Sequence, residues 1–194
     1  MENIQEITEI INPKKSALVI WDVQKMLVNN IFNREEFLTN TKFLIAAARE
    51  KGVPIFFTKI TPLPEQFESP AKKFFMKNRP RGFAFTPDGL DLAITPKEED
   101  VVLNKNTASI FVGTNFELVM RNAGLSTVIF SGISTEIGVE SSARDALNRG
   151  FFPVIVTDAV SSSNQDAHTR SLQNLKNMMV LLSANDLISL WKNG

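Results

Sequence analysis

Asp22 and Lys105 are the charged residues whose positions most favour chemistry. Asp22 directly follows the apolar run at residues 17–21, and Lys105 closely follows the apolar run at 101–103. If both runs are parallel strands, both side chains lie beyond the carboxyl ends of the sheet, where open α/β sheets bind ligands. Burial raises the pKa of a carboxyl group unless a cation lies near, and Lys105 would be that cation. We expect the two side chains within one hydrogen bond or one bridging water, as an acid/base pair or as an ion pair closing the sheet edge.

Further polar side chains are expected at the same edge of the sheet. Gln24 lies two residues after Asp22, and Ser134 and Thr135 follow the apolar run at residues 127–131. Either hydroxyl would be an alternative nucleophile, although Thr135 also suits the N-cap of the helix that follows it.

A repeated pattern predicts the elements that must position these residues. Three times a polar-faced helical stretch ends in Gly and a β-branched or aromatic run follows, as REKG–VPIFFTK, RNAG–LSTVIFSG and LNRG–FFPVIVTDA. Gly commonly ends helices, and continuous apolar runs are typical of strands buried on both faces. This alternation predicts an α/β fold of three layers, α/β/α, with a central parallel sheet of about six strands, as one domain over residues 1–194.

The predicted boundaries follow from the same runs. Strands are expected at residues 17–22, 54–58, 101–104, 127–131, 152–157 and 179–182. Helices are expected at residues 35–51, 115–123, 135–149, 167–176 and 185–192.

Residues 60–98 interrupt the alternation as a long insertion. The segment contains prolines at positions 62, 64, 70, 80, 87 and 96 and the basic, phenylalanine-rich stretch KKFFMKNRPRGFAF. Long loops in compact domains are often lids or interface segments, and a partly helical surface excursion is the alternative. We expect residues near 74–85 to cover the pocket or to pack on a neighbouring subunit. Arg79 and Arg81 would grip a substrate carboxylate, or belong to a solvated loop or a subunit contact.

The composition excludes several classes of site. The chain has no cysteine, which removes disulfides, thiolate metal sites and a Cys nucleophile. Its one histidine, His168, is expected on a helix surface without a partner, which argues against a metal site. Lys+Arg and Asp+Glu balance at 21 each, and no stretch resembles a signal peptide or a membrane span. We expect a cytoplasmic protein with no cofactor, no metal, and no nucleic-acid or membrane partner.

Three stretches, in order, resemble the motifs of the isochorismatase-like, or cysteine hydrolase, family. They are ALVIWDVQKML, KNTASIFVGTNFELVMRNAG and SGISTEIGVESSARDALNRGFFPVIVTDAVSS, and the likeness covers roughly residues 15–183. The resemblance implies the three-layer fold, a small-molecule substrate and a homo-oligomer, either a dimer or a tetramer. It also implies a cis peptide between Ile133 and Ser134, which cysteine-bearing members often have.

The chain departs from the family at Gly138, which stands where the third motif has its nucleophilic Cys. In cysteine-bearing members Asp, Lys and Cys form the triad that hydrolyses amides such as nicotinamide or carbamoyl compounds. Isochorismatases proper also lack this Cys and have the pair that Ile137 and Gly138 supply here. They hydrolyse the enol ether of isochorismate to 2,3-dihydro-2,3-dihydroxybenzoate and pyruvate, a reaction that needs a proton donor and no thiol.

Carried onto this chain, the resemblance implies that Asp22 donates a proton to the enol-ether methylene carbon. Lys105 would orient the acid or bind a substrate carboxylate, Gly138 would leave room for the substrate, and Gln24 would position Asp22 or water. The expected substrate-binding set is Gln24, Ser134, Thr135, Arg79 and Arg81.

Two alternatives remain open. One is hydrolysis of another small amide or ureide by Asp22-activated water, and the other is an inactive, ligand-binding member. The stretch TKITPLPEQ does not reproduce the aromatic-Thr-x-Gln-Pro stretch of isochorismatases, so the substrate stays open.

Overall fold

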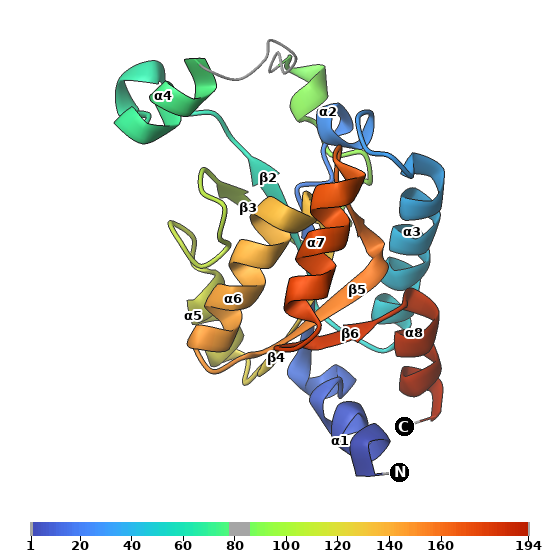
Figure 1. The fold of residues 1–194 in the computed structure, drawn as a ribbon. Coiled ribbons are helices and arrows are strands. Elements are labelled where there is room, and N and C mark those ends of the chain that lie inside the picture. The colour runs from blue at the N-terminus through green and yellow to red at the C-terminus, as the bar shows by residue number, and fades with distance from the viewer. Residues whose placement is uncertain (1, 78–85, 194) are drawn as a thin grey trace.

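Six parallel strands form the centre of the fold (Figure 1). The computed structural model describes residues 2–77 and 86–193. The strands lie in the order β3–β2–β1–β4–β5–β6. Their bounds are Ser16–Trp21 (β1), Ile55–Ile60 (β2), Val101–Lys105 (β3), Thr127–Ile133 (β4), Phe152–Ser161 (β5) and Val180–Leu182 (β6). The predicted parallel sheet of six strands is confirmed.

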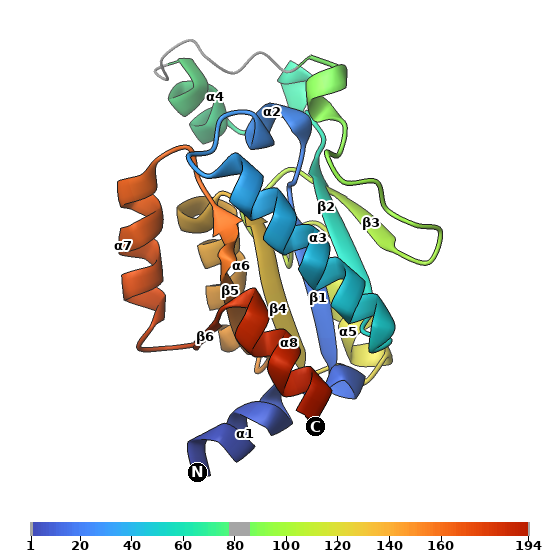
Figure 2. The same ribbon diagram turned by 90° about the vertical axis from the view of Figure 1, so that its right-hand side faces the viewer.

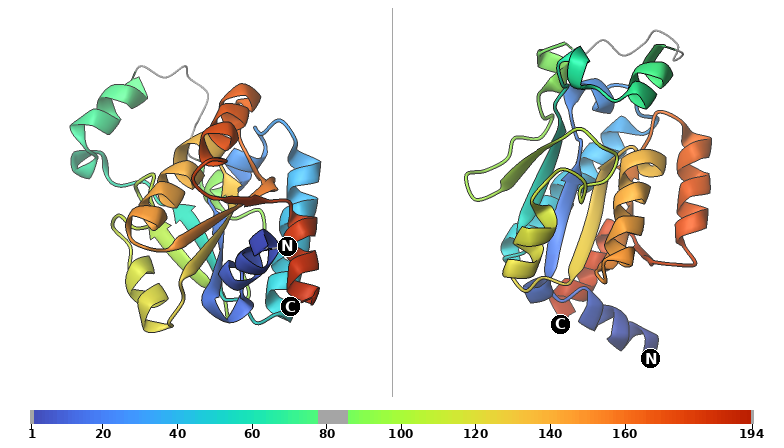
Figure 3. Two further views of the ribbon diagram at one scale, coloured as in Figure 1. Left: turned by 60° about the horizontal axis from the view of Figure 1, so that its bottom comes forward. Right: turned by 90° about the vertical axis from the view of Figure 1, so that its left-hand side faces the viewer.

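Helices cover both faces of this sheet, as Figures 2 and 3 show. On one face lie α3 (Arg34–Glu50) and α8 (Ala184–Asn193). On the other lie α5 (Phe116–Asn122), α6 (Glu140–Asn148) and α7 (Gln165–Leu175). The predicted three-layer arrangement is therefore confirmed.

Strand β1 is buried on both faces, which explains its continuous apolar run. All six of its residues are buried, because successive side chains point to opposite faces and helices cover both. Leu18 and Ile20 pack in the core under α3, whereas Val19 and Trp21 pack in the core under α6. Chain order reverses between β1 and β4, which makes the carboxyl end of β1 the switch point where such sheets form ligand crevices.

The described helical parts of the insertion lie at this carboxyl edge, together with the short helix α2 (Lys25–Val28) (Figure 1). The described part forms a 3-10 turn, η2 (Glu65–Phe67), the helix α4 (Pro70–Lys77) and a second turn, η3 (Asp88–Leu90). Phe75 on α4 is 64% exposed. Arg79 and Arg81, and most of the stretch near 74–85, lie outside the described residues.

Two helical features differ from the sequence prediction. An N-terminal helix, α1 (Glu2–Ile10), and the 3-10 turn η1 (Pro13–Lys15) precede β1 at the opposite edge from the insertion. The helix expected over 135–149 begins as a π-helical turn, η4 (Thr135–Val139), and only then continues as α6. In the described part of the chain, no helix is long and apolar enough to cross a membrane.

Candidate active site

Asp22 occupies a tight turn directly after β1. Its φ of 47° lies in the left-handed region, which non-glycine residues rarely adopt. The turn closes through the backbone amide of Gln24, which donates to the Asp22 carbonyl at 2.7 Å. The Asp22 amide donates to Thr58 Oγ1 at 3.0 Å, so the neighbouring strand β2 holds the turn in place. Such conformations persist where the surroundings enforce them, often at functional sites.

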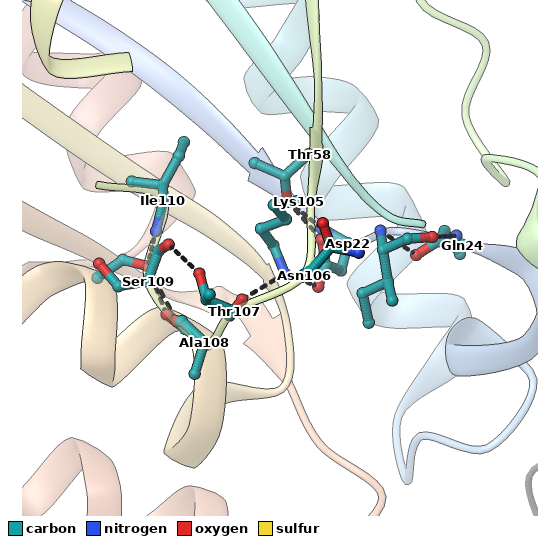
Figure 4. Close-up of polar contacts among 12 residues, drawn as sticks. Asp22, Gln24, Thr58, Lys105, Asn106, Thr107, Ala108, Ser109 and Ile110 are labelled. Atoms are coloured by element: carbon teal, nitrogen blue, oxygen red, sulfur yellow. Dashed lines mark hydrogen bonds and ion pairs between the residues drawn. The ribbon is translucent and has the colours of Figure 1, made fainter. Parts of the chain in front are cut away.

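The Asp22 carboxylate is held at both oxygens (Figure 4). Lys105 Nζ donates to Oδ2 at 2.6 Å, and Thr58 Oγ1 donates to Oδ1 at 2.6 Å. Lys105 Nζ also donates to the Thr107 carbonyl at 3.2 Å. The expected short contact between Asp22 and Lys105 is confirmed, and the two side chains are each only 3% exposed.

Burial shifts both partners toward their neutral forms. Desolvation raises the pKa of Asp22 above its ordinary value, although Lys105 and Thr58 oppose that rise. Desolvation likewise lowers the pKa of Lys105, although Asp22 opposes that fall. A carboxyl group with a raised pKa retains its proton to a higher pH, which is the property a general acid needs.

The segment after β3 places Lys105. Asn106 donates from its side-chain amide to the Thr61 carbonyl, which joins the ends of β3 and β2. Farther on, Ser109 Oγ donates to Asp145 Oδ2 at 2.5 Å, and the Ile110 amide donates to Ser142 Oγ at 3.2 Å. Both acceptors lie on α6, so the loop that follows the lysine is fixed to the helical layer (Figure 4).

The side-chain amide of Gln24 hydrogen-bonds to the backbone of the insertion. Its amide nitrogen donates to the carbonyls of Ile60 and Leu90 at 3.2 and 2.7 Å, and its Oε1 accepts from the Ile60 amide at 2.9 Å. The side chain is fully buried. Gln24 therefore joins the start of the insertion to its η3 turn, instead of using its side-chain amide to position Asp22 or water as the resemblance implied.

Ser134 and Thr135 lie at the carboxyl end of β4, and the expected N-cap is corrected by one residue. Ser134 is the N-cap, and the helical segment begins at Thr135. Thr135 is fully buried, and its Oγ1 donates to the Ser161 carbonyl at 3.1 Å. The peptide between Ile133 and Ser134 is cis, as the resemblance implied.

His168 has a partner that the sequence did not reveal. Its Nδ1 lies 2.8 Å from Thr135 Oγ1, and its ring meets Phe32 edge-on with centroids 5.2 Å apart. Burial lowers the pKa of His168, which favours the neutral ring, although Glu136 opposes the fall. The expectation of a surface histidine without a partner was wrong, because α7 folds back against η4 and no spacing in the sequence signals that contact.

The space beside Gly138 is filled by Trp21. A Cβ built on Gly138 would lie 1.9 Å from Trp21 Nε1 and 2.2 Å from Cε2. The expectation that Gly138 leaves room for substrate is therefore corrected. Lys105 contacts the same indole, with its Nζ 4.0 Å from the centroid of the Trp21 ring.

Comparisons with known proteins show which family the chain and its fold resemble. Residues 16–186 match the isochorismatase domain. An uncharacterised isochorismatase family protein of Escherichia coli O157:H7, YecD, is 30% identical over 177 residues, which cover 85% of this chain and 89% of that protein. The ureidoacrylate amidohydrolase RutB of Pseudomonas savastanoi pv. phaseolicola is 26% identical over 202 residues, which cover 90% of this chain and 82% of that protein. The solved cysteine hydrolase of Pseudomonas syringae pv. phaseolicola 1448A has a TM-score of 0.85 at 19% identity, with 95% of each chain covered.

Proposed function

Because the chain belongs to the isochorismatase family of hydrolases, we propose that it hydrolyses a small carboxylated molecule with Asp22 as its general acid. The observation that carries this proposal is the buried carboxyl group of Asp22, held between Lys105 and Thr58. The chain has no thiol, so the reaction proceeds without a covalent cysteine intermediate. The enol ether of isochorismate is the type substrate.

The proposed reaction balances with the residues at the site. Asp22 gives its proton to the methylene carbon of the enol ether, which leaves an oxocarbenium ion. Water adds to that cation and gives one of its protons to the Asp22 carboxylate, which restores the acid. The resulting hemiketal then collapses to pyruvate and an alcohol, and its hydroxyl proton passes to the departing alcohol oxygen. Lys105, 2.6 Å from Oδ2, stabilises the carboxylate that forms when the proton leaves.

The second candidate is hydrolysis of a small amide or ureide, and a relative named as a ureidoacrylate amidohydrolase favours it. Here Asp22 would act as a base and take a proton from the attacking water. The same residue therefore has opposite protonation requirements in the two candidate reactions. An inactive, ligand-binding protein is the third reading, and it predicts no turnover of either class.

A substrate panel followed by a pH profile separates these candidates. Enol ethers, amides and ureides carrying a carboxylate are tested first, and kcat/KM is then measured against pH for any substrate turned over. If Asp22 is the acid, kcat/KM falls as pH rises through its raised pKa, because the proton is lost. A kcat/KM that rises through the same pKa would contradict the acid and support the base. No turnover anywhere in the panel would favour the ligand-binding reading.

We also propose that the chain acts as a homo-oligomer, in keeping with the exposed aromatic side chains on the insertion. Phe67 and Phe75 are 67% and 64% exposed on the described part of that segment. Light scattering on the purified protein tests this, and a monomeric mass would contradict it.

A further inference from the structure

Trp21 is a large aromatic side chain that packs against Lys105 of the acid/base pair. It ends β1 and is only 1% exposed. Lys105 Nζ lies over its ring at 4.0 Å from the centroid, within cation–π range. The indole therefore packs directly beneath the ammonium group that binds Asp22.

Two glycines lie tightly against Trp21, and one of them, Gly138, faces the indole. At Gly138 a Cβ would meet the Nε1 edge of the ring at 1.9 Å, and at Gly132 a Cβ would meet the Trp21 backbone carbonyl at 2.1 Å. Real Cβ contacts are essentially never this short, so Gly138 admits no side chain while the indole keeps its place, and Gly132 admits none beside the backbone of β1. Gly132 has a φ of 128°, which itself favours glycine. Gly138 lies in the helical turn η4 without a positive φ, so space alone accounts for its lack of a side chain.

The edge of the indole that meets Gly138 carries the ring nitrogen, Nε1. Among the described residues, no hydrogen bond involves Trp21 Nε1, so packing holds the ring in this position. The ring thus bridges Lys105 on β3 and Gly138 on η4, and it fills the space through which a side chain at position 138 would approach Lys105.

We propose that Trp21 and Gly138 form a matched large–small pair in which the indole plugs the position a nucleophile at 138 would occupy. The plug keeps the Asp22–Lys105 pair free of a covalent partner, so the site works by proton transfer to or from Asp22. This inference rests on the proposed function, because it assumes that Asp22 is the group that transfers the proton. Its geometry can be tested without any substrate.

A double-mutant cycle tests the matched pair through thermal stability. Gly138→Ala should lower Tm by roughly 5 °C in the wild-type background, because the added methyl overpacks against the indole. In a Trp21→Phe background the smaller ring no longer reaches Gly138, so the added methyl group causes no overpacking. Gly138→Ala should then leave Tm unchanged or raise it, because Ala has a higher helix propensity than Gly. An equal loss of Tm in both backgrounds would overturn the pair.

A chemical test asks directly whether the indole blocks a nucleophile. Because the chain has no cysteine, Gly138→Cys introduces its only thiol. With p-nitrophenyl acetate as probe, the thiolate attacks the ester carbonyl, a thioester forms and p-nitrophenolate leaves, which mass spectrometry detects as one acetyl group.

We expect acetylation to be at least about tenfold faster in Trp21→Phe/Gly138→Cys than in Gly138→Cys alone, because the plug is withdrawn. Ser141→Cys, with and without Trp21→Phe, is the matched control on the adjoining helix and should react equally in both backgrounds. If Gly138→Cys reacts as fast with Trp21 present as with the Trp21→Phe substitution, the plug is overturned. Since neither measurement uses the substrate, this failure is distinct from a failure of the acid role of Asp22.

Discussion

Thr58 is the residue that sequence reasoning missed at the centre of the site. It lies inside an apolar strand, and its hydroxyl both accepts from the Asp22 amide and donates to Asp22 Oδ1. Asp22 and Lys105 could be predicted because charged residues at strand ends are conspicuous in the sequence. Thr58 could not, because threonine is common in strands and only the pairing of β1 with β2 brings it to Asp22.

We predict that Thr58→Val moves the pH profile of kcat/KM to higher pH. The Thr58 hydrogen bond lowers the pKa of Asp22, so its loss raises that pKa further and an acid-dependent activity persists to higher pH. The variant should also lose roughly 1–3 kcal/mol of unfolding free energy, because the buried Asp22 amide is left without an acceptor. The pH profile and urea unfolding measure these two effects.

Thr127→Val is the matched control for this prediction. Thr127 is a fully buried strand threonine whose Oγ1 donates to the Ile10 carbonyl at 2.6 Å, at the opposite edge of the sheet. It should lose stability and leave the pH profile where it was. An unmoved profile in Thr58→Val would show that the hydroxyl does not tune Asp22.

Among the structural elements, the insertion is bound to the sheet edge through the side chain of Gln24. The sequence predicted a long segment over 60–98, but it did not predict that Gln24 would bind Ile60 at its start and Leu90 in the η3 turn. A partner 66 residues away leaves no local pattern in the sequence. The same reason hides the contact between His168 and Thr135.

We predict that Gln24→Ala loosens the insertion without unfolding the sheet. The variant loses three hydrogen bonds and leaves the Ile60 amide without its acceptor. Limited trypsin digestion, read by mass spectrometry, should cut within residues 60–98 at least about tenfold faster than in the wild type. Asn40→Ala, which removes an amide contact between α3 and the Asp158 carbonyl, is the control and should leave that cleavage rate unchanged. Equal cleavage rates in the two variants would show that the Gln24 hydrogen bonds do not hold the insertion in place.

At the packing of α7 on η4, His168 gives a pH-dependent stability. Its folded-state pKa is lowered by burial, so the contribution of the neutral ring is present above the unfolded pKa and is lost as pH falls through the folded value. Between pH 7 and pH 5 the wild type should therefore lose more Tm than His168→Asn, which has no titrating ring. Parallel losses of Tm in the two proteins would contradict this assignment.

For the whole molecule, the three layers and the parallel sheet followed from alternation along the chain. Gly-ended helices and continuous apolar runs predicted six parallel strands, because only burial on both faces permits such runs. The π-helical start of η4 was not predicted, and it lies where Trp21 approaches the turn after β4, although the two segments are far apart in sequence. The residues that define the site thus come from separate strands, and the sequence predicted that they share the carboxyl edge of the sheet.

The central claim is that Asp22 exchanges the proton that drives hydrolysis. Asp22→Asn keeps the shape of the side chain and removes its acid/base function, whereas Asp100→Asn makes the same change at another buried carboxylate, paired with Arg49 at 2.5 Å just before β3 begins.

The most direct measurement is therefore kcat/KM for these two variants on whichever substrate the panel identifies, with folding checked by circular dichroism. We predict a loss of roughly two to four orders of magnitude for Asp22→Asn and a change of only a few-fold for Asp100→Asn. An Asp22→Asn variant that folds and retains kcat/KM within about tenfold of the wild type would contradict the account.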